Sequence, residues 1–280
     1  MDSLAIHRLA EPTLSGLQQI RERIKSFQEI RDILESLKTM AQIEIQKLAR
    51  FQDSQSQATE AVRAPLRDLL SFHPYLWTKE VDESQGVLLV FGSERGFCGD
   101  FNASLEMVAE GWKGPLVLIG SRLTERFAER ENVHHLTGPV AVEEVEGCLY
   151  GLLEVLNGLG PVHLTALLHD EADRTRPQPQ PIWPVQEEPP EPEYGYPPEH
   201  HLPLERLLSR LLDHYFSAIL HRLLYSSLLA ENRHRIRHLE GAVQHLDQNV
   251  ESLKRRRNKR RQEEITNEIE VLLMGAEFLD

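Results

Sequence analysis

The feature that most constrains this chain is an apolar repeat in its last third. Apolar residues recur there at alternating steps of three and four, at Ile236, Leu239, Val243, Leu246, Val250 and Leu253. This spacing is typical of a coiled-coil seam, in which a narrow stripe on one helix packs against a second helix. The stripe resumes after a basic interruption, at Ile265, Ile269, Leu272 and Ala276. It predicts one helix from about Leu204 to Leu279, roughly 110 Å long, which must project from a domain of this size.

A second long helix is predicted near the N-terminus, from about Leu17 to Leu70. Its apolar residues also follow steps of three and four, at Leu17, Ile20, Ile24, Phe27, Ile30, Leu34, Leu37, Ala41, Ile45 and Leu48. Ser15 or Thr13 can cap its start, and Pro74 favours its end because the residue before a proline leaves the helical region. Two helices with matching seams, separated by a domain, favour antiparallel pairing with each other.

The middle of the chain has a different pattern, in which short apolar runs alternate with polar, helix-like stretches. The predicted strands are residues 87–91, 115–119 and 162–168, and the predicted helices are 103–110, 121–130 and 142–159. Continuous apolar runs are typical of strands buried on both faces, so this alternation predicts a small, doubly wound, mostly parallel α/β (Rossmann-like) domain. Arg174 to Pro203 is dense in proline and acidic residues, which predicts an extended linker without regular structure.

The predicted fold class is therefore α/β plus coiled coil, with the α/β domain inserted between two long terminal helices. The N-terminal helix takes residues 14–73, the α/β domain 84–172, the proline-rich linker 173–203 and the C-terminal helix 204–280.

Composition excludes several classes of protein. The formal net charge of -13 opposes nucleic-acid binding by the whole molecule, because phosphates would repel it. We find neither an apolar run of about 18 residues nor the layout of a signal peptide, and we therefore expect a cytosolic chain. Cys98 and Cys148 lie far apart in the sequence, so neither a disulfide framework nor a zinc cluster is indicated.

Three segments share motifs with one known family. Residues 258–269 read NKRRQEEITNEI, similar to the family's NKxRQxxITxEI. Residues 92–102 read GSERGFCGDFN, similar to TSDRGLCGxxN, with matches at Arg95, Gly96, Cys98, Gly99 and Asn102. Residues 20–26 read IRERIKS, similar to IRxxIxS. On these segments the chain resembles the γ subunit of F-type ATP synthases, over about Leu17 to Leu279.

Two segments depart from that family's pattern. The first helix carries Ile33 to Ala41 where the family has a methionine- and lysine-rich stretch, and the final helix carries Arg237 to His245 where the family has MKxAxxNA. Such departures are typical of a divergent branch, for example an alternative F-type ATPase carried beside a standard one.

The resemblance implies a central-stalk rotor subunit that is not itself an enzyme and holds no cofactor or metal. Its partners would be the α and β subunits of the catalytic hexamer, the ε subunit and the membrane c-ring. Rotation would couple the flow of protons or sodium ions to ATP synthesis or hydrolysis. The subunit would be peripheral to the cytoplasmic face of the inner (plasma) membrane, held there through the complex.

The basic run from Lys254 to Arg261 allows three interpretations. By itself it predicts a solvated helix face, or a nucleic-acid patch that the acidic composition disfavours. The resemblance instead implies contact with the hexamer, through Lys254, Arg255, Arg256, Arg257, Arg261 and Gln262, with Arg261 and Gln262 foremost. Long-range attraction between charges can guide a rotating surface without the interlocking of apolar packing.

The loop from Gly92 to Asn102 follows a strand and is rich in glycine, which can indicate phosphate binding. It has neither the Walker-A nor the Gly-x-Gly-x-x-Gly spacing, so we expect a structural role. Gly96 and Gly99 would allow tight turns, while Arg95 and Asn102 fix the loop against the terminal helices or a stalk subunit. We expect Cys98 to be packed and unreactive.

His234 and His238 lie four apart, as metal ligands can, but no nearby cysteine or carboxylate completes a site and we predict a solvated face. Two further functions remain open. A coiled-coil adaptor or tether with an α/β binding domain would share the periodicity but would not explain residues 258–269. A Rossmann-type enzyme would need a cofactor fingerprint, which we do not find.

Overall fold

The computed structural model describes residues 16–76, 86–123, 126–160, 163–169, 176–183 and 195–277. Contacts divide the chain into two units, and each is described by itself. The sheet unit comprises Thr39–His238, and the terminal unit comprises Met1–Lys38 with Leu239–Asp280.

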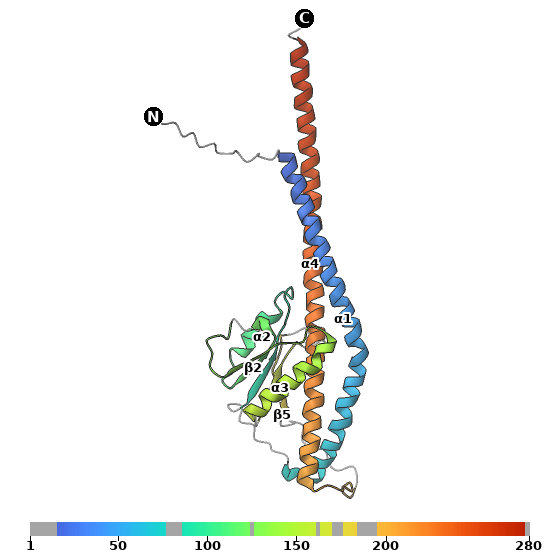
Figure 1. Ribbon diagram of the computed structural model, residues 1–280, viewed down its shortest axis with the longest axis vertical. Helices are drawn as coiled ribbons and strands as arrows, with labels where there is room; N and C mark the ends of the chain where they lie inside the picture. Colours follow the sequence, from blue (N-terminus) through green and yellow to red (C-terminus); the bar gives the residue numbers. More distant parts are fainter. Residues whose placement is uncertain are drawn as a thin grey trace, which may run out of the picture. The chain divides into compact units, whose positions relative to one another are not determined.

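Two long helices begin and end the described chain (Figure 1). Helix α1 (Gly16–Phe72) has 57 residues and helix α4 (Leu204–Glu277) has 74, which confirms the two long predicted helices. The N–H of His73 still bonds the carbonyl of Leu69 at 3.1 Å, and the helix then stops before Pro74, as predicted. The predicted caps Ser15 and Thr13 lie outside the described residues.

The seams of the two helices meet in the terminal unit. Ile20 and Ile24 on α1 pack with Val250 on α4, and Leu34 packs with Leu239 and Val243. Residue numbers rise along α1 as they fall along α4, so the helices run antiparallel. The predicted pairing of the chain's two ends is confirmed.

The sheet unit holds a five-stranded sheet in the order β3-β2-β1-β4-β5. Its strands are β1 (Val87–Phe91), β2 (Leu116–Ile119), β3 (Val133–Leu136), β4 (Leu164–Leu167) and β5 (Gln180–Trp183). The pairs β1–β2, β1–β4 and β2–β3 are parallel, and only β5 is antiparallel to its neighbour β4. The prediction of a mostly parallel sheet is confirmed.

Helices cover both faces of this sheet, which explains why β1 and β2 are buried along their whole length. Helix α3 (Val145–Leu159) packs on the face that carries Leu89 and Phe91, together with parts of α1 and α4. Helix α2 (Phe101–Ala109) packs on the face that carries Leu88 and Val90 (Figure 1). The domain is therefore doubly wound.

One predicted helix in the middle of the chain was wrong, and one strand was missed. Residues 121–130 were expected to form a helix, but they hold a short 3-10 turn, η3 (Ser121–Leu123), and a further turn at 126–129. Among the described residues of this segment, only Leu123 and Phe127 are buried apolar side chains, so a longer helix would gain little packing. Strand β3 was missed because it is an edge strand whose His134 and His135 are exposed, which removes the apolar run that marks a buried strand.

The predicted linker also contains a regular element, contrary to our expectation. Strand β5 forms within it because Ile182 is buried and its carbonyl accepts a hydrogen bond from the hydroxyl of Tyr215 at 3.3 Å. Pro181 is tolerated because β5 is an edge strand, where a missing N–H is not required on the open side. Residues 173–175 and 184–194 of the predicted linker lie outside the described residues.

Candidate functional site

The basic segment, residues 254–262 of α4, lies in the terminal unit where the apolar seam ends. Arg255, Arg256, Arg261 and Gln262 are exposed, whereas Lys254 and Arg257 are half-buried. Arg255 pairs with Glu251 at 3.3 Å, one helical turn away. Among the described residues, no hydrogen bond or ion pair engages the side chains of Arg256 and Arg261. The segment therefore presents positive charge to its surroundings.

Helix α4 continues beyond the first residue of α1. The guanidinium of Arg260 lies so close to Gly16 that an added methyl group there would come within 2.6 Å of Cζ. Beyond this point Ile265 and Ile269 are 47% and 50% exposed, although they continue the apolar stripe. Within the described residues, this end of α4 has apolar positions but no partner helix.

The predicted loop, residues 92–102, is closed by the side chain of Asn102. Its Oδ1 accepts the N–H of Ser93 at 2.9 Å, and its Nδ2 donates to the Ser93 hydroxyl at 2.8 Å. Gly99 has a positive φ of 62°, and a Cβ at this position would lie 3.3 Å from the ring of His238. Both the backbone conformation and the close approach therefore favour glycine here.

A buried ion pair on α4 holds the loop. Arg235 donates to the carbonyl of Gly96 at 3.2 Å and also contacts the carboxylate of Glu231. The same carboxylate accepts the N–H of Arg95 at 3.4 Å. Burial raises the pKa of Glu231, while the positive charge of Arg235 lowers it. Arg95 thus contributes its backbone to this contact, and its side chain is exposed.

Sequence reasoning missed Glu231 and Arg235. The available signal was an acid and a base four residues apart on a helix, a spacing that places them on one face. Cys98 lies beneath the same contact and is 6% exposed. Burial raises the pKa of its thiol to about 11, which keeps it in the protonated form near neutral pH.

Comparisons with known proteins identify the family. A protein-family model described as ATP synthase matches residues 16–279. The chain belongs to this ATP synthase family. It is 28% identical to the ATP synthase gamma chain of Saccharopolyspora erythraea, covering 95% of this chain and 98% of that one. It is 27% identical to the ATP synthase gamma chain of Mycolicibacterium gilvum, covering 94% of this chain and 97% of that one.

Solved structures share the fold of this ATP synthase family member. A chain from Euglena gracilis mitochondrial ATP synthase (OSCP/F1/c-ring, rotational state 3) has a TM-score of 0.65 at 13% identity, with 92% of each chain covered. A chain from the rotor of the same ATP synthase in rotational state 1 has a TM-score of 0.62 at 13% identity, covering 89% of this chain and 98% of that one.

The carboxyl edge of the sheet is where doubly wound domains usually bind ligands. In this family member the protein's own side chains occupy that edge. Glu94 accepts the N–H groups of Ser121 and Gly138, both at 2.9 Å, and so ties together the ends of β1, β2 and β3. Ser227 of α4 donates to the carbonyl of Phe91 at the end of β1. These contacts join the ends of three strands and α4 at that edge.

The prediction of a solvated face for the histidines was wrong for His234. Its ring packs edge-on against Phe101 at 5.1 Å between centroids and lies 4.9 Å from His169. Burial lowers the pKa of His234 to about 4. His238 is exposed. In the part of the chain that the structure describes, no group of side chains has the composition and proximity to hold a metal ion, and no helix could cross a membrane.

Proposed function

We propose that this chain is the γ subunit of an F-type ATP synthase or ATPase, the rotor of its central stalk. The relatives named above are gamma chains, and the described fold resembles rotor chains of solved ATP synthases. The observation that carries the proposal is the antiparallel seam in the terminal unit, which joins the first and last helices of the family fold.

The rotor function requires stiffness rather than reactive groups. A shaft with two unlike helices, turning inside a hexamer of α and β subunits, contacts each β subunit differently. Each catalytic site is thereby biased in turn among states of different nucleotide affinity. Ion flow through the membrane ring would drive this rotation in synthesis, and ATP hydrolysis would drive it in reverse. Coupling by protons or by sodium ions is compatible with this geometry.

The basic segment supplies the hexamer contacts in this proposal. Arg255, Arg256, Arg261 and Gln262 are exposed and can meet acidic loops of the surrounding subunits, while half-buried Lys254 and Arg257 shape the same surface. Attraction between exposed charges guides orientation and association more than it fixes one position, which suits a surface that must turn. The exposed Ile265 and Ile269 would lie farther inside the hexamer.

The sheet unit serves as the base in this proposal, beside the ε subunit and on the c-ring. Gly96, Cys98, Gly99 and Asn102 then have a structural role, since Glu231 and Arg235 hold their loop against α4. The chain itself is not catalytic, and it is peripheral to the cytoplasmic face of the membrane through its complex.

The test is assembly with the α and β subunits of the organism that encodes this chain. We expect a complex on size-exclusion chromatography, ATP hydrolysis by that complex, and rotation of a bead attached to the sheet unit. The pair Arg256→Glu and Arg261→Glu should weaken assembly about tenfold or more, because like charges would then face each other. Arg206→Glu, an exposed arginine near the other end of α4, is the matched control.

Each outcome separates the candidate functions. Failure to form a complex would exclude the rotor and favour a coiled-coil adaptor or tether. Equal assembly by the charge-reversed pair and by the Arg206→Glu control would retain the rotor but exclude the basic segment as its contact. ATP turnover by the isolated chain would contradict the non-catalytic assignment.

A further inference from the structure

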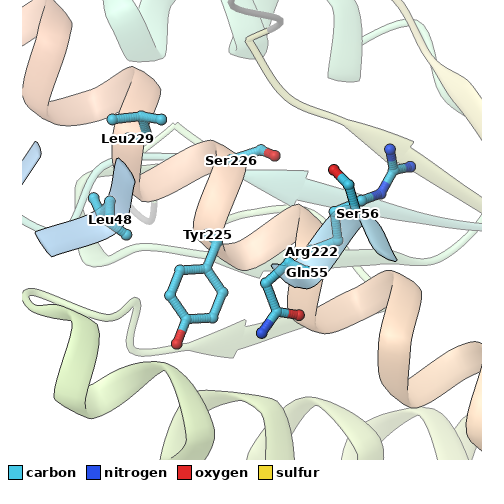
Figure 2. A pocket seen from close by; sticks show the side chains of 7 residues that line it. All are labelled: Leu48, Gln55, Ser56, Arg222, Tyr225, Ser226 and Leu229. Atoms are coloured by element: carbon cyan, nitrogen blue, oxygen red, sulfur yellow. The ribbon is translucent and has the colours of Figure 1, made fainter. Parts of the chain in front are cut away.

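The seam of α1 turns polar in the middle of the sheet unit. The steps of three and four that lead to Leu48 continue through Phe51, which is 40% exposed, and then through the polar Gln55 and Thr59. Apolar residues return at Val62 and Leu66. The polar side chains at these positions do not fill the space opposite α4. A cavity of about 150 Å³ remains between the two helices, lined by Leu48, Gln55, Ser56, Arg222, Tyr225, Ser226 and Leu229 (Figure 2).

The two ends of this cavity differ in chemistry. Leu48 and Leu229 form one end and are 2% and 3% exposed. Arg222 and Ser56 lie at the other end, on the opposite side of Figure 2. Arg222 and Leu229 are seven residues apart on one face of α4, which corresponds to roughly 10 Å along the helix. The cavity therefore runs from a buried apolar end to a cationic end that is open to solvent, where Arg222 and Ser56 are exposed.

The polar side chains of the lining are available to a ligand. No hydrogen bond or ion pair joins the side chains of Gln55, Ser56, Arg222 or Ser226 to another residue in the described ranges. The ring of Tyr225 is held between Phe51 and His221, at centroid distances of 5.8 and 4.9 Å. Burial raises the pKa of Tyr225.

We propose that this cavity binds a small aromatic carboxylate, with its ring between Leu48, Leu229 and Tyr225 and its carboxylate at Arg222. The volume suits a single aromatic ring, because enclosed apolar cavities of about 150 Å³ bind benzene, and here Leu48 and Leu229 supply the apolar end for the ring while the carboxylate takes the open end. Arginine supports the charge and the shape, because its planar guanidinium matches a carboxylate with two parallel hydrogen bonds. The hydroxyl of Ser56 can donate to the same carboxylate. This binding is independent of the rotor function.

The probe for this site is 4-fluorobenzoate, titrated into the full-length chain and followed by fluorine NMR. A ligand of ten heavy atoms should bind with a dissociation constant on the order of 1 mM. Arg222→Gln should weaken binding about tenfold, because it removes a charge-assisted pair. Arg210→Gln changes the same charge elsewhere on α4 and should leave binding unchanged. Ser226→Leu should fill the cavity and abolish binding, while circular dichroism shows retained helix.

A neutral analogue of the probe and an inorganic anion without a ring provide the decisive comparison. We expect 4-fluorobenzyl alcohol to bind at least several-fold more weakly than 4-fluorobenzoate, and sulfate not to displace the probe at equal concentration. The proposal is overturned if 4-fluorobenzoate does not bind at 20-fold the expected dissociation constant, since the cavity would then hold only water. It is also overturned if Arg222→Gln and Arg210→Gln behave alike, or if Ser226→Leu still binds the probe.

Discussion

The buried ion pair between Glu231 and Arg235 offers the sharpest test of how α4 holds the motif loop. Arg235→Met removes the cation and leaves the carboxylate of Glu231, 4% exposed, without its charged partner. Breaking a buried pair in this way costs about 3–5 kcal/mol, because an uncompensated charge remains inside the protein. The carbonyl of Gly96 and the amide of Asn232 lose hydrogen bonds of 3.2 and 2.9 Å at the same time.

Urea unfolding of the full-length chain, followed by circular dichroism at pH 7, measures this cost. Arg255→Met is the matched control, because Arg255 pairs with Glu251 across the same four-residue spacing but in an exposed position. An exposed pair contributes about 0–1 kcal/mol, so this control should change the free energy of unfolding little. Replacing both buried charges, as in E231L with R235M, should recover about 1–3 kcal/mol relative to R235M alone.

The pH dependence adds a signature that a merely structural defect would not have. Burial already raises the pKa of Glu231 in the folded chain, and loss of Arg235 removes a group that lowers it. A carboxyl group whose pKa is raised in the folded state binds more protons in the folded chain than in the unfolded chain. Its contribution to the free energy of unfolding therefore becomes less favourable as pH rises. The cost of R235M should therefore shrink as pH falls from 7 toward 5. A cost below about 1 kcal/mol at pH 7, or one independent of pH, would refute the reasoning.

Three further predictions concern neighbouring residues. Gly99→Val should destabilise the sheet unit by about 1–2 kcal/mol in the same urea assay, since it forces a β-branched residue to a φ of 62° and against His238; an unchanged midpoint would contradict this. His234 has a pKa lowered to about 4 from 6.5, so it binds protons on unfolding, and stability should fall as pH drops from 6.5 to 4. His234→Phe should reduce this loss of stability at low pH. If stability falls equally steeply with pH in both proteins, the buried imidazole is not its cause. Cys98, with its pKa raised to about 11 from 9.0, should react with iodoacetamide at pH 8 roughly 100-fold more slowly than in urea, as judged by mass spectrometry.

The sequence alone determined the long helices and their pairing. Helix periodicity is a local property, because residues three and four apart share a face whatever the rest of the chain does. The stripes ending at Leu48 and at Leu253 therefore predicted α1, α4 and an antiparallel seam. The apolar runs at residues 87–91 and 115–119 predicted two central strands for the same reason. Short motifs were enough to suggest the γ-subunit family.

The edge strands were decided only by tertiary structure. Strand β3 exposes His134 and His135, and β5 contains Pro181, so neither carries a local signal for a strand. Each exists because a neighbouring strand offers its open edge for hydrogen bonding. A segment with weak preferences adopts the conformation that its neighbours can pair with.

The functional details of the sheet unit also depended on contacts between distant parts of the chain. Arg95 and Glu231 are separated by 136 positions, as are Phe91 and Ser227, so no local pattern could reveal that α4 holds the loop and covers the end of β1. The cavity near Arg222 likewise arises because polar positions of α1 face α4. Local spacing sets which residues share a face, whereas only the folded chain decides what that face meets.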